Sequence, residues 1–272
     1  MRRLAPHILL FALTVVSTYV IGGFVYSATL MAILLAHEMG HYLVSRRHRV
    51  SASLPYFIPL PFPPFGTLGA IIKTRSPIPN RRALLDIGVS GPLAGLLIAL
   101  PAIGLGLLLS NPVPVRELPQ ETVKLSSPLF FSLIQKVVLG ELPKGYDLVL
   151  HPMAYAGWVG LFVTALNLLP IGQLDGGHVI YALFGPNSRV IFRWAIVGLA
   201  ATALIFNLGW FVLIALLVGI GYRHPPPVDD FTPLNLKRKL LAVLTIGIFF
   251  SSFTPVPFPQ WSVGLKDLLR GS

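Results

Sequence analysis

The sequence contains no cysteine, and charged side chains make up only 11% of its 272 residues. Without cysteine the chain can form no disulfide bond and offers no thiolate to a metal ion, so any bound metal must use nitrogen and oxygen ligands. The scarcity of charge, together with a hydrophobic fraction of 54%, excludes an ordinary soluble domain. Several apolar stretches are long enough to cross a bilayer, so we expect a polytopic membrane protein.

The net charge of +11 does not indicate a nucleic-acid partner, because of where the cations lie. They gather in short segments between apolar stretches, as in the run Arg46-Arg47-His48-Arg49, where membrane topology places positive charge. Most of them fall on one side of the membrane if the N-terminus is cytoplasmic. We therefore expect contact with the lipid bilayer and none with nucleic acid.

The hydrophobic pattern predicts an all-α polytopic membrane protein with six to seven transmembrane helices. The first two spans meet near Gly22-Gly23, where glycine loosens a tight connection. Seven spans result if the apolar stretch 188–222 is divided at Asn207-Leu208-Gly209, since an unbroken helix of that length would exceed the thickness of a bilayer. We expect residues 1–272 to form one membrane-embedded domain with its core at about 28–186.

Two segments depart from the helical pattern. Residues 51–82 are too rich in proline for a helix, and the run 66–72 within them suits a strand-like segment that is partly embedded in the membrane. A plain surface loop is the alternative. Later, Pro170 and Gly172 interrupt an apolar stretch, which predicts one broken helix.

The run His37-Glu38-Met39-Gly40-His41 lies within an otherwise apolar stretch, residues 28–44. On a helix, residues four apart lie on one face, so the two imidazoles converge on one point with Glu38 beside them. Two neutral imidazoles at this spacing suit a zinc ion, and the carboxylate can accept a proton from water. An unpaired ionisable side chain in hydrocarbon costs about 2.5 kcal/mol or more, which favours a metal site over a structural polar cluster.

A catalytic zinc site usually has a third protein ligand. The best candidate is Asp175, in the run Leu174-Asp175-Gly176-Gly177-His178 that follows the break in the later span. Asp175 can instead cap the resumed helix through the glycine amides, and the two roles are compatible. His178 is a rival ligand, but we expect it to be an interface histidine or a neighbour of the ligands.

These two motifs, in this order, resemble the site-2 protease family of intramembrane zinc metalloproteases. The resemblance covers roughly residues 28–184 and is strongest to the compact bacterial and plastid branch, which has no PDZ domain. It implies one zinc ion per chain, bound by His37, His41 and Asp175, with Glu38 as general base. Asn167 corresponds to the family's asparagine, which is thought to hold substrate or the oxyanion, although its spacing to Asp175 is longer here than in the short form of the motif.

The implied function is regulated intramembrane proteolysis, in which peptide bonds of membrane-spanning substrate proteins are hydrolysed. Residues 66–72 would then offer a strand edge to the unwound substrate. The alternative is a catalytically silent metal-binding scaffold or a transporter. The intact Glu38 argues against that alternative, because zinc binding alone needs no base between two histidines. We also expect the bacterial inner membrane as the location, with a cytoplasmic N-terminus.

Overall fold

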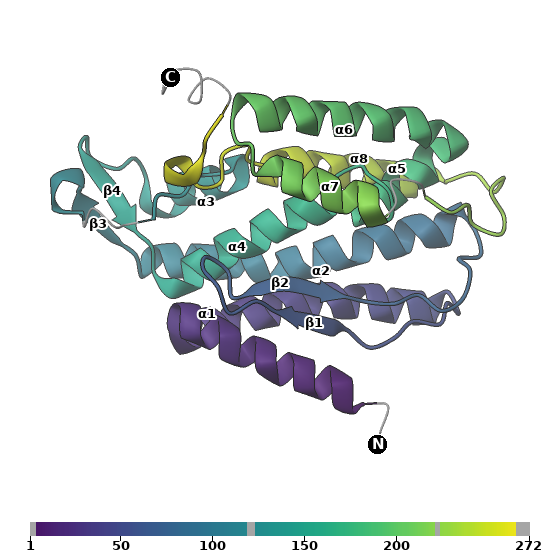
Figure 1. Ribbon diagram of the computed structural model, residues 1–272, viewed down its shortest axis with the longest axis horizontal. Helices are drawn as coiled ribbons and strands as arrows, with labels where there is room; N and C mark the ends of the chain where they lie inside the picture. Colours follow the sequence, from purple (N-terminus) through teal and green to yellow (C-terminus); the bar gives the residue numbers. More distant parts are fainter. Residues whose placement is uncertain (1–3, 119–122, 221–223, 265–272) are drawn as a thin grey trace. The chain divides into compact units, whose positions relative to one another are not determined.

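The computed structural model describes residues 4–118, 123–220 and 224–264, and Figure 1 shows their mostly helical arrangement. The chain divides into two compact units. Of the described residues, the first comprises 4–78, 90–118 and 131–164, and the second comprises 79–89, 123–130, 165–220 and 224–264. One helix, α2 (Arg81–Leu108), begins in the second unit and continues into the first. The single domain expected from the sequence stays a prediction.

The first unit opens with α1 (Ala5–Arg47), a 43-residue helix that bends sharply at Gly23. Gly23 has a φ of 73° and a ψ of −173°, a conformation that glycine adopts without steric cost. The two legs then fold back on each other, since the Ser27 hydroxyl donates to the Val15 carbonyl at 3.1 Å and lies 2.7 Å from the Thr18 hydroxyl (Figure 1). The two helical legs therefore meet at Gly23, within the connection expected near Gly22-Gly23.

The strand predicted within residues 66–72 is confirmed. It is β2 (Thr67–Ile71), and it pairs antiparallel with β1 (Tyr56–Pro59), with Phe57 opposite Ala70. The sequence did not reveal β1, because the prolines around it mask its strand pattern. Whether the pair is embedded in the membrane stays a prediction.

Three aromatic rings of the first unit stack in a row along one helix. Trp158 of α4 (Pro152–Asn167) is fully buried, and its ring stacks on Phe162 at 5.7 Å and on Tyr155 at 6.3 Å between centroids. The peripheral elements are a second two-stranded sheet, a short helical turn and a helix: β3 (Asn111–Pro114), β4 (Tyr146–Val149), η1 (Val115–Glu117) and α3 (Leu129–Leu139).

Besides the start of α2, the second unit contains a group of helices that begins with α5, where the broken span resumes. Its elements are α5 (Asp175–Phe184), η2 (Gly185–Asn187), α6 (Ser188–Ile205), α7 (Trp210–Ile220), α8 (Leu236–Ser252) and η3 (Pro259–Trp261). The turn predicted at residues 207–209 lies between α6 and α7. Asp86 of α2 and Arg238 of α8 form an ion pair with two hydrogen bonds, at 2.8 and 2.7 Å, which ties the start of α2 to α8.

Among the described residues, three helical stretches are long and apolar enough to cross a membrane: α1, α2 and residues 175–205. The predicted membrane protein with a broken helix agrees with this architecture, although two small sheets make it less than all-α. The count of six to seven spans stays a prediction.

Candidate metal centre

The two motif histidines lie together on the second leg of α1. Their Nε2 atoms are 3.1 Å apart, and their rings are inclined at 71°. His37 and Glu38 are only 4% and 5% exposed, and His41 is half-buried. The four-residue spacing thus produces the convergence that the sequence predicted, inside the first unit and away from bulk water.

Glycine allows α1 and α2 to approach closely around this pair. A Cβ atom on Gly40 would lie 2.5 Å from the Ser90 carbonyl oxygen of α2. On the facing side, a Cβ on Gly91 would overlap the His41 imidazole, and one on Gly95 would lie 3.3 Å from His37 Cβ. The imidazoles therefore occupy space that any larger residue at these positions would take.

Asp175 lies in the second unit, at the start of α5. The first part of the broken span, α4, ends at Asn167. A short irregular segment follows, and the second part, α5, begins at Asp175 with Leu174 in the N-cap position. The segment is compact, because a Cβ on Gly177 would overlap the Gly172 carbonyl oxygen. Asp175 is thus the first helical residue and not the cap, and its carboxylate lies at the positive end of the α5 dipole.

The face of α2 that carries Gly91 also contacts α5. Gly88 lies one helical turn earlier on α2, and within the second unit a Cβ there would be 3.2 Å from the Asp175 carbonyl oxygen and 2.7 Å from His178 Cβ. Glycines 88, 91 and 95 are three and four residues apart, which places them on one face of α2. This face packs against α5 in the second unit and against the histidines in the first.

Within the described part of the chain, the side chains that can each offer one ligand atom to a metal ion are His37 and His41 of the first unit and Asp175 of the second. Two imidazole nitrogens and a carboxylate oxygen are the donor set of many catalytic zinc sites, so the residues fit the ion. Glu38 follows His37 in the chain and is buried, and its role as general base stays a prediction. The role of Asn167, the last residue of α4, stays a prediction.

The structure adds a neighbourhood that the sequence did not predict. His178 lies against His224, with ring centroids 4.7 Å apart, and Tyr181 donates a hydrogen bond to Asp230 at 3.1 Å. His224 and Asp230 follow α7, 40 and 46 residues beyond the end of α5. The one local signal was the pair Asp229-Asp230 in a proline-rich segment, which does not identify its partners.

Comparison with known proteins identifies a peptidase family. Residues 25–216 match peptidase family M50. "Probable zinc metalloprotease EGY1, chloroplastic" from Oryza sativa subsp. japonica is 34% identical over 246 residues, which cover 88% of this chain and 41% of the relative. The protein of the same name from Arabidopsis thaliana is 34% identical over 234 residues, 83% of this chain and 42% of the relative.

A further relative, "Probable zinc metalloprotease EGY2, chloroplastic" from Oryza sativa subsp. indica, is 30% identical over 241 residues, covering 86% of this chain and 43% of the relative. The chain therefore spans less than half the length of these relatives. No solved structure matches it significantly.

The expected location is wrong. The sequence led us to a bacterial inner membrane with a cytoplasmic N-terminus, whereas the relatives that match are named as chloroplast proteins. The apolar pattern could not make this distinction, because it depends on bilayer thickness and not on the organelle. The multi-pass membrane character is consistent with the candidate spans.

Replacing Gly91 by alanine should weaken zinc binding, because the new methyl group would displace the His41 imidazole. We expect the zinc affinity of the purified protein to fall by about tenfold or more, as when the support of a ligand is removed. Gly104→Ala is the matched control on the same helix, since a Cβ there has no neighbour within 4 Å. Equal zinc affinities in the two variants would show that the close packing on His41 is unimportant.

Proposed function

The chain belongs to peptidase family M50, the family of the site-2 proteases, and on that premise we propose that it is a zinc metalloprotease that cuts membrane-spanning proteins. The observation that carries the proposal is the buried cluster on α1. His37, Glu38 and His41 lie within one turn of an apolar helix, with the two Nε2 atoms 3.1 Å apart. Ionisable groups in such a setting are costly, and a bound cation would compensate for them.

The proposed ligands are His37, His41 and Asp175. The glycine face of α2 supports this set, because Gly88 contacts the turn that carries Asp175 and Gly91 contacts His41. When bound, zinc supplies Lewis acidity, which polarises a peptide carbonyl and makes water easier to deprotonate.

The remaining steps fall to side chains of the chain itself. Glu38 accepts the proton of the attacking water and returns it to the leaving amine. Its burial at 5% exposure excludes bulk water, which would otherwise compete for that proton. Asn167, at the end of α4, donates a hydrogen bond to the substrate carbonyl as negative charge develops on its oxygen.

A substrate helix must unwind before its carbonyls can be attacked, and we propose that β2 receives the unwound peptide as an added strand. One edge of the strand region is already used: the Lys73 amide donates to Ser53 Oγ, and the Arg75 amide donates to the Ser51 carbonyl. Amides alternate between the two edges of a strand, so the amide of Ile71 faces β1 and that of Ala70 faces the open edge.

The proposed setting is a plastid membrane, crossed six to seven times. The bend of α1 supports the higher number, because each leg is apolar and the two legs fold back on each other. The turn between α6 and α7 supports it as well, since it divides a stretch that is too long for one crossing.

Glu38→Gln tests the proposed reaction against a silent scaffold or a transporter. The amide is nearly isosteric with the carboxylate but cannot accept the proton, so cleavage of a reconstituted transmembrane substrate should fall by at least about a hundredfold. Zinc content, measured by elemental analysis, should stay near one per chain. If wild-type protein and Glu38→Gln release peptide at the same rate, Glu38 is not the base.

Alanine substitution tests the ligand set. His37→Ala, His41→Ala and Asp175→Ala should each lower the zinc bound per chain, because each removes one of three ligand atoms. His151→Ala is the control, since His151 is half-buried in the first unit but belongs to no ligand group among the described residues. If Asp175→Ala has a normal zinc content and His178→Ala loses zinc, the third ligand is His178 and not Asp175.

Ala70→Pro tests strand addition, because proline removes the amide that faces the open edge. We expect the rate of cleavage to fall about tenfold or more, because a backbone hydrogen bond to the substrate is lost and local strain is added. Ala70→Ser keeps the amide and should retain activity, and zinc content should be normal in both variants. Full activity of Ala70→Pro would exclude this edge as the substrate strand.

A further inference from the structure

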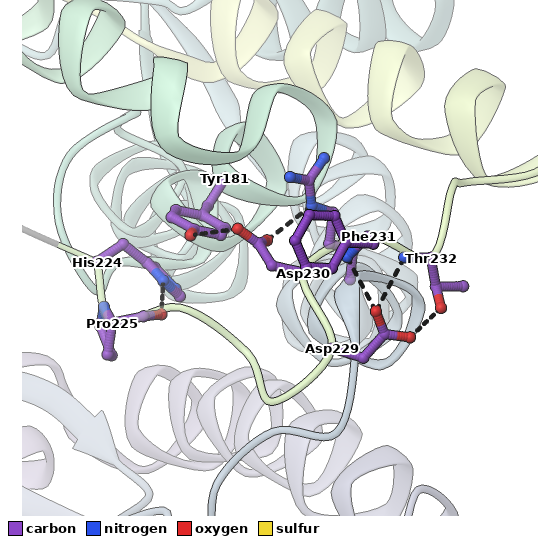
Figure 2. Close-up of polar contacts among 8 residues, drawn as sticks. Tyr181, His224, Pro225, Asp229, Asp230, Phe231 and Thr232 are labelled. Carbon is purple, nitrogen blue, oxygen red and sulfur yellow. Dashed lines mark hydrogen bonds and ion pairs between the residues drawn. The ribbon is translucent and has the colours of Figure 1, made fainter.

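Residues 224–233, between α7 and α8, form a strap across part of the second unit. Asp230 fastens it: one carboxylate oxygen accepts from the Tyr181 hydroxyl at 3.1 Å (Figure 2). The other accepts from Arg81 Nε at 2.8 Å. The Asp229 amide also donates to the Pro79 carbonyl at 2.8 Å. The strap is therefore bound both to the beginning of α2 and to α5.

His224, the first described residue of the strap, packs on one face of α5. Its ring stacks on Tyr181, at 4.7 Å between centroids and 28° between planes, and meets His178 edge-on, also at 4.7 Å. His178 and Tyr181 are three residues apart, so they are neighbours on the helix surface. His224 thus covers the first turns of α5.

The contacts of His224 are those of a neutral, packed ring. Desolvation and the nearby His178 lower the pKa of His224 to about 3. Its Nδ1 donates to the Pro225 carbonyl at 2.6 Å (Figure 2), whereas its buried Nε2 has no hydrogen-bond partner among the described residues. The His224 ring therefore supports α5 by packing against it and not by a hydrogen bond from Nε2.

His178 connects the strap to the residue before Asp175. The Leu174 carbonyl oxygen accepts the His178 backbone amide at 3.0 Å and lies 3.0 Å from His178 Nδ1. On the opposite side, a Cβ on Gly88 would be 2.7 Å from His178 Cβ, so α2 leaves the histidine no room to move that way. His178 is thus held between α2 and His224, and it fixes the turn in which Asp175 is the first helical residue.

We propose that the strap sets the position of Asp175, with His224 as a positioning residue that acts through His178. This inference rests on the proposed function, because it takes Asp175 as a zinc ligand. Groups that orient a ligand commonly change metal affinity by about 10- to 100-fold when they are removed. A strap that served only to stabilise the fold would leave the zinc affinity of the folded protein unchanged.

The test is the zinc affinity of the full chain in detergent, measured by competition with a chromophoric chelator. His224→Ala should bind zinc about tenfold more weakly than the wild type, because the ring that supports His178 is lost. His224→Phe keeps an aromatic ring of similar shape and should bind zinc nearly as well as the wild type. Phe231→Ala is the control within the strap, since that side chain is 95% exposed.

A double substitution separates the route through His178 from an independent effect. If His224 acts through His178, the variant with both residues changed to alanine should lose no more zinc affinity than His178→Ala alone. Fully additive losses would contradict that route. The thermal unfolding temperature of each zinc-free variant identifies those whose fold itself has been lost.

Failure of this inference can be distinguished from failure of the proposed function. If Asp175→Ala weakens zinc binding while His224→Ala does not, the strap has no positioning role and the ligand set stands. The same conclusion follows if His224→Phe is as weak as His224→Ala. If Asp175→Ala itself binds zinc normally, the ligand set and the strap's role are both wrong.

Discussion

The close approach of helices to the backbone of α2 is the constraint on which the proposed site depends. Histidine is bulky, and a helix with ordinary side chains would hold it too far away. Glycine at positions 88, 91 and 95 removes those side chains along one face, so that His37, His41 and the first turn of α5 each lie against bare backbone. In a membrane, where packing and hydrogen bonds replace the hydrophobic effect between helices, small residues are the usual means of such approach.

The irregular segment between β1 and β2 is held by hydrogen bonds from two tyrosines. Between β1 and β2 the chain makes a turn rich in proline, whose carbonyl groups need donors if they lie away from water. Tyr26 supplies one by donating to the Phe65 carbonyl at 2.8 Å, and Tyr155 supplies another by donating to the Pro64 carbonyl at 2.9 Å. The hairpin is thereby fixed to α1 and α4, and β2 is left with a defined open edge.

Features that depend on residues close together in the sequence could be predicted from it. The spacing of His37 and His41 predicted their convergence, and the β-compatible run near Ala70 predicted a strand. Contacts between distant segments were not predictable: Arg81 meets Asp230 and Asp86 meets Arg238, each pair about 150 residues apart, and no periodicity identifies such partners. The strap was missed for the same reason. The organelle was missed because hydropathy reports the bilayer and not the compartment that contains it.

The bend at Gly23 bears on how the chain enters its membrane during synthesis. A 43-residue helix that folds back on itself brings both of its ends to the same side, so its two legs can be inserted together as a helical hairpin. The leg that carries His37, Glu38 and His41 is the harder one to transfer into lipid, since an ionisable residue at the centre of a span opposes insertion. Residues 8–22 of the other leg contain no charged side chain. The first leg is hydrogen-bonded to the second through Thr18 and Ser27. Inserting the two legs together would offset part of the free-energy cost of inserting the second leg, before any zinc is bound.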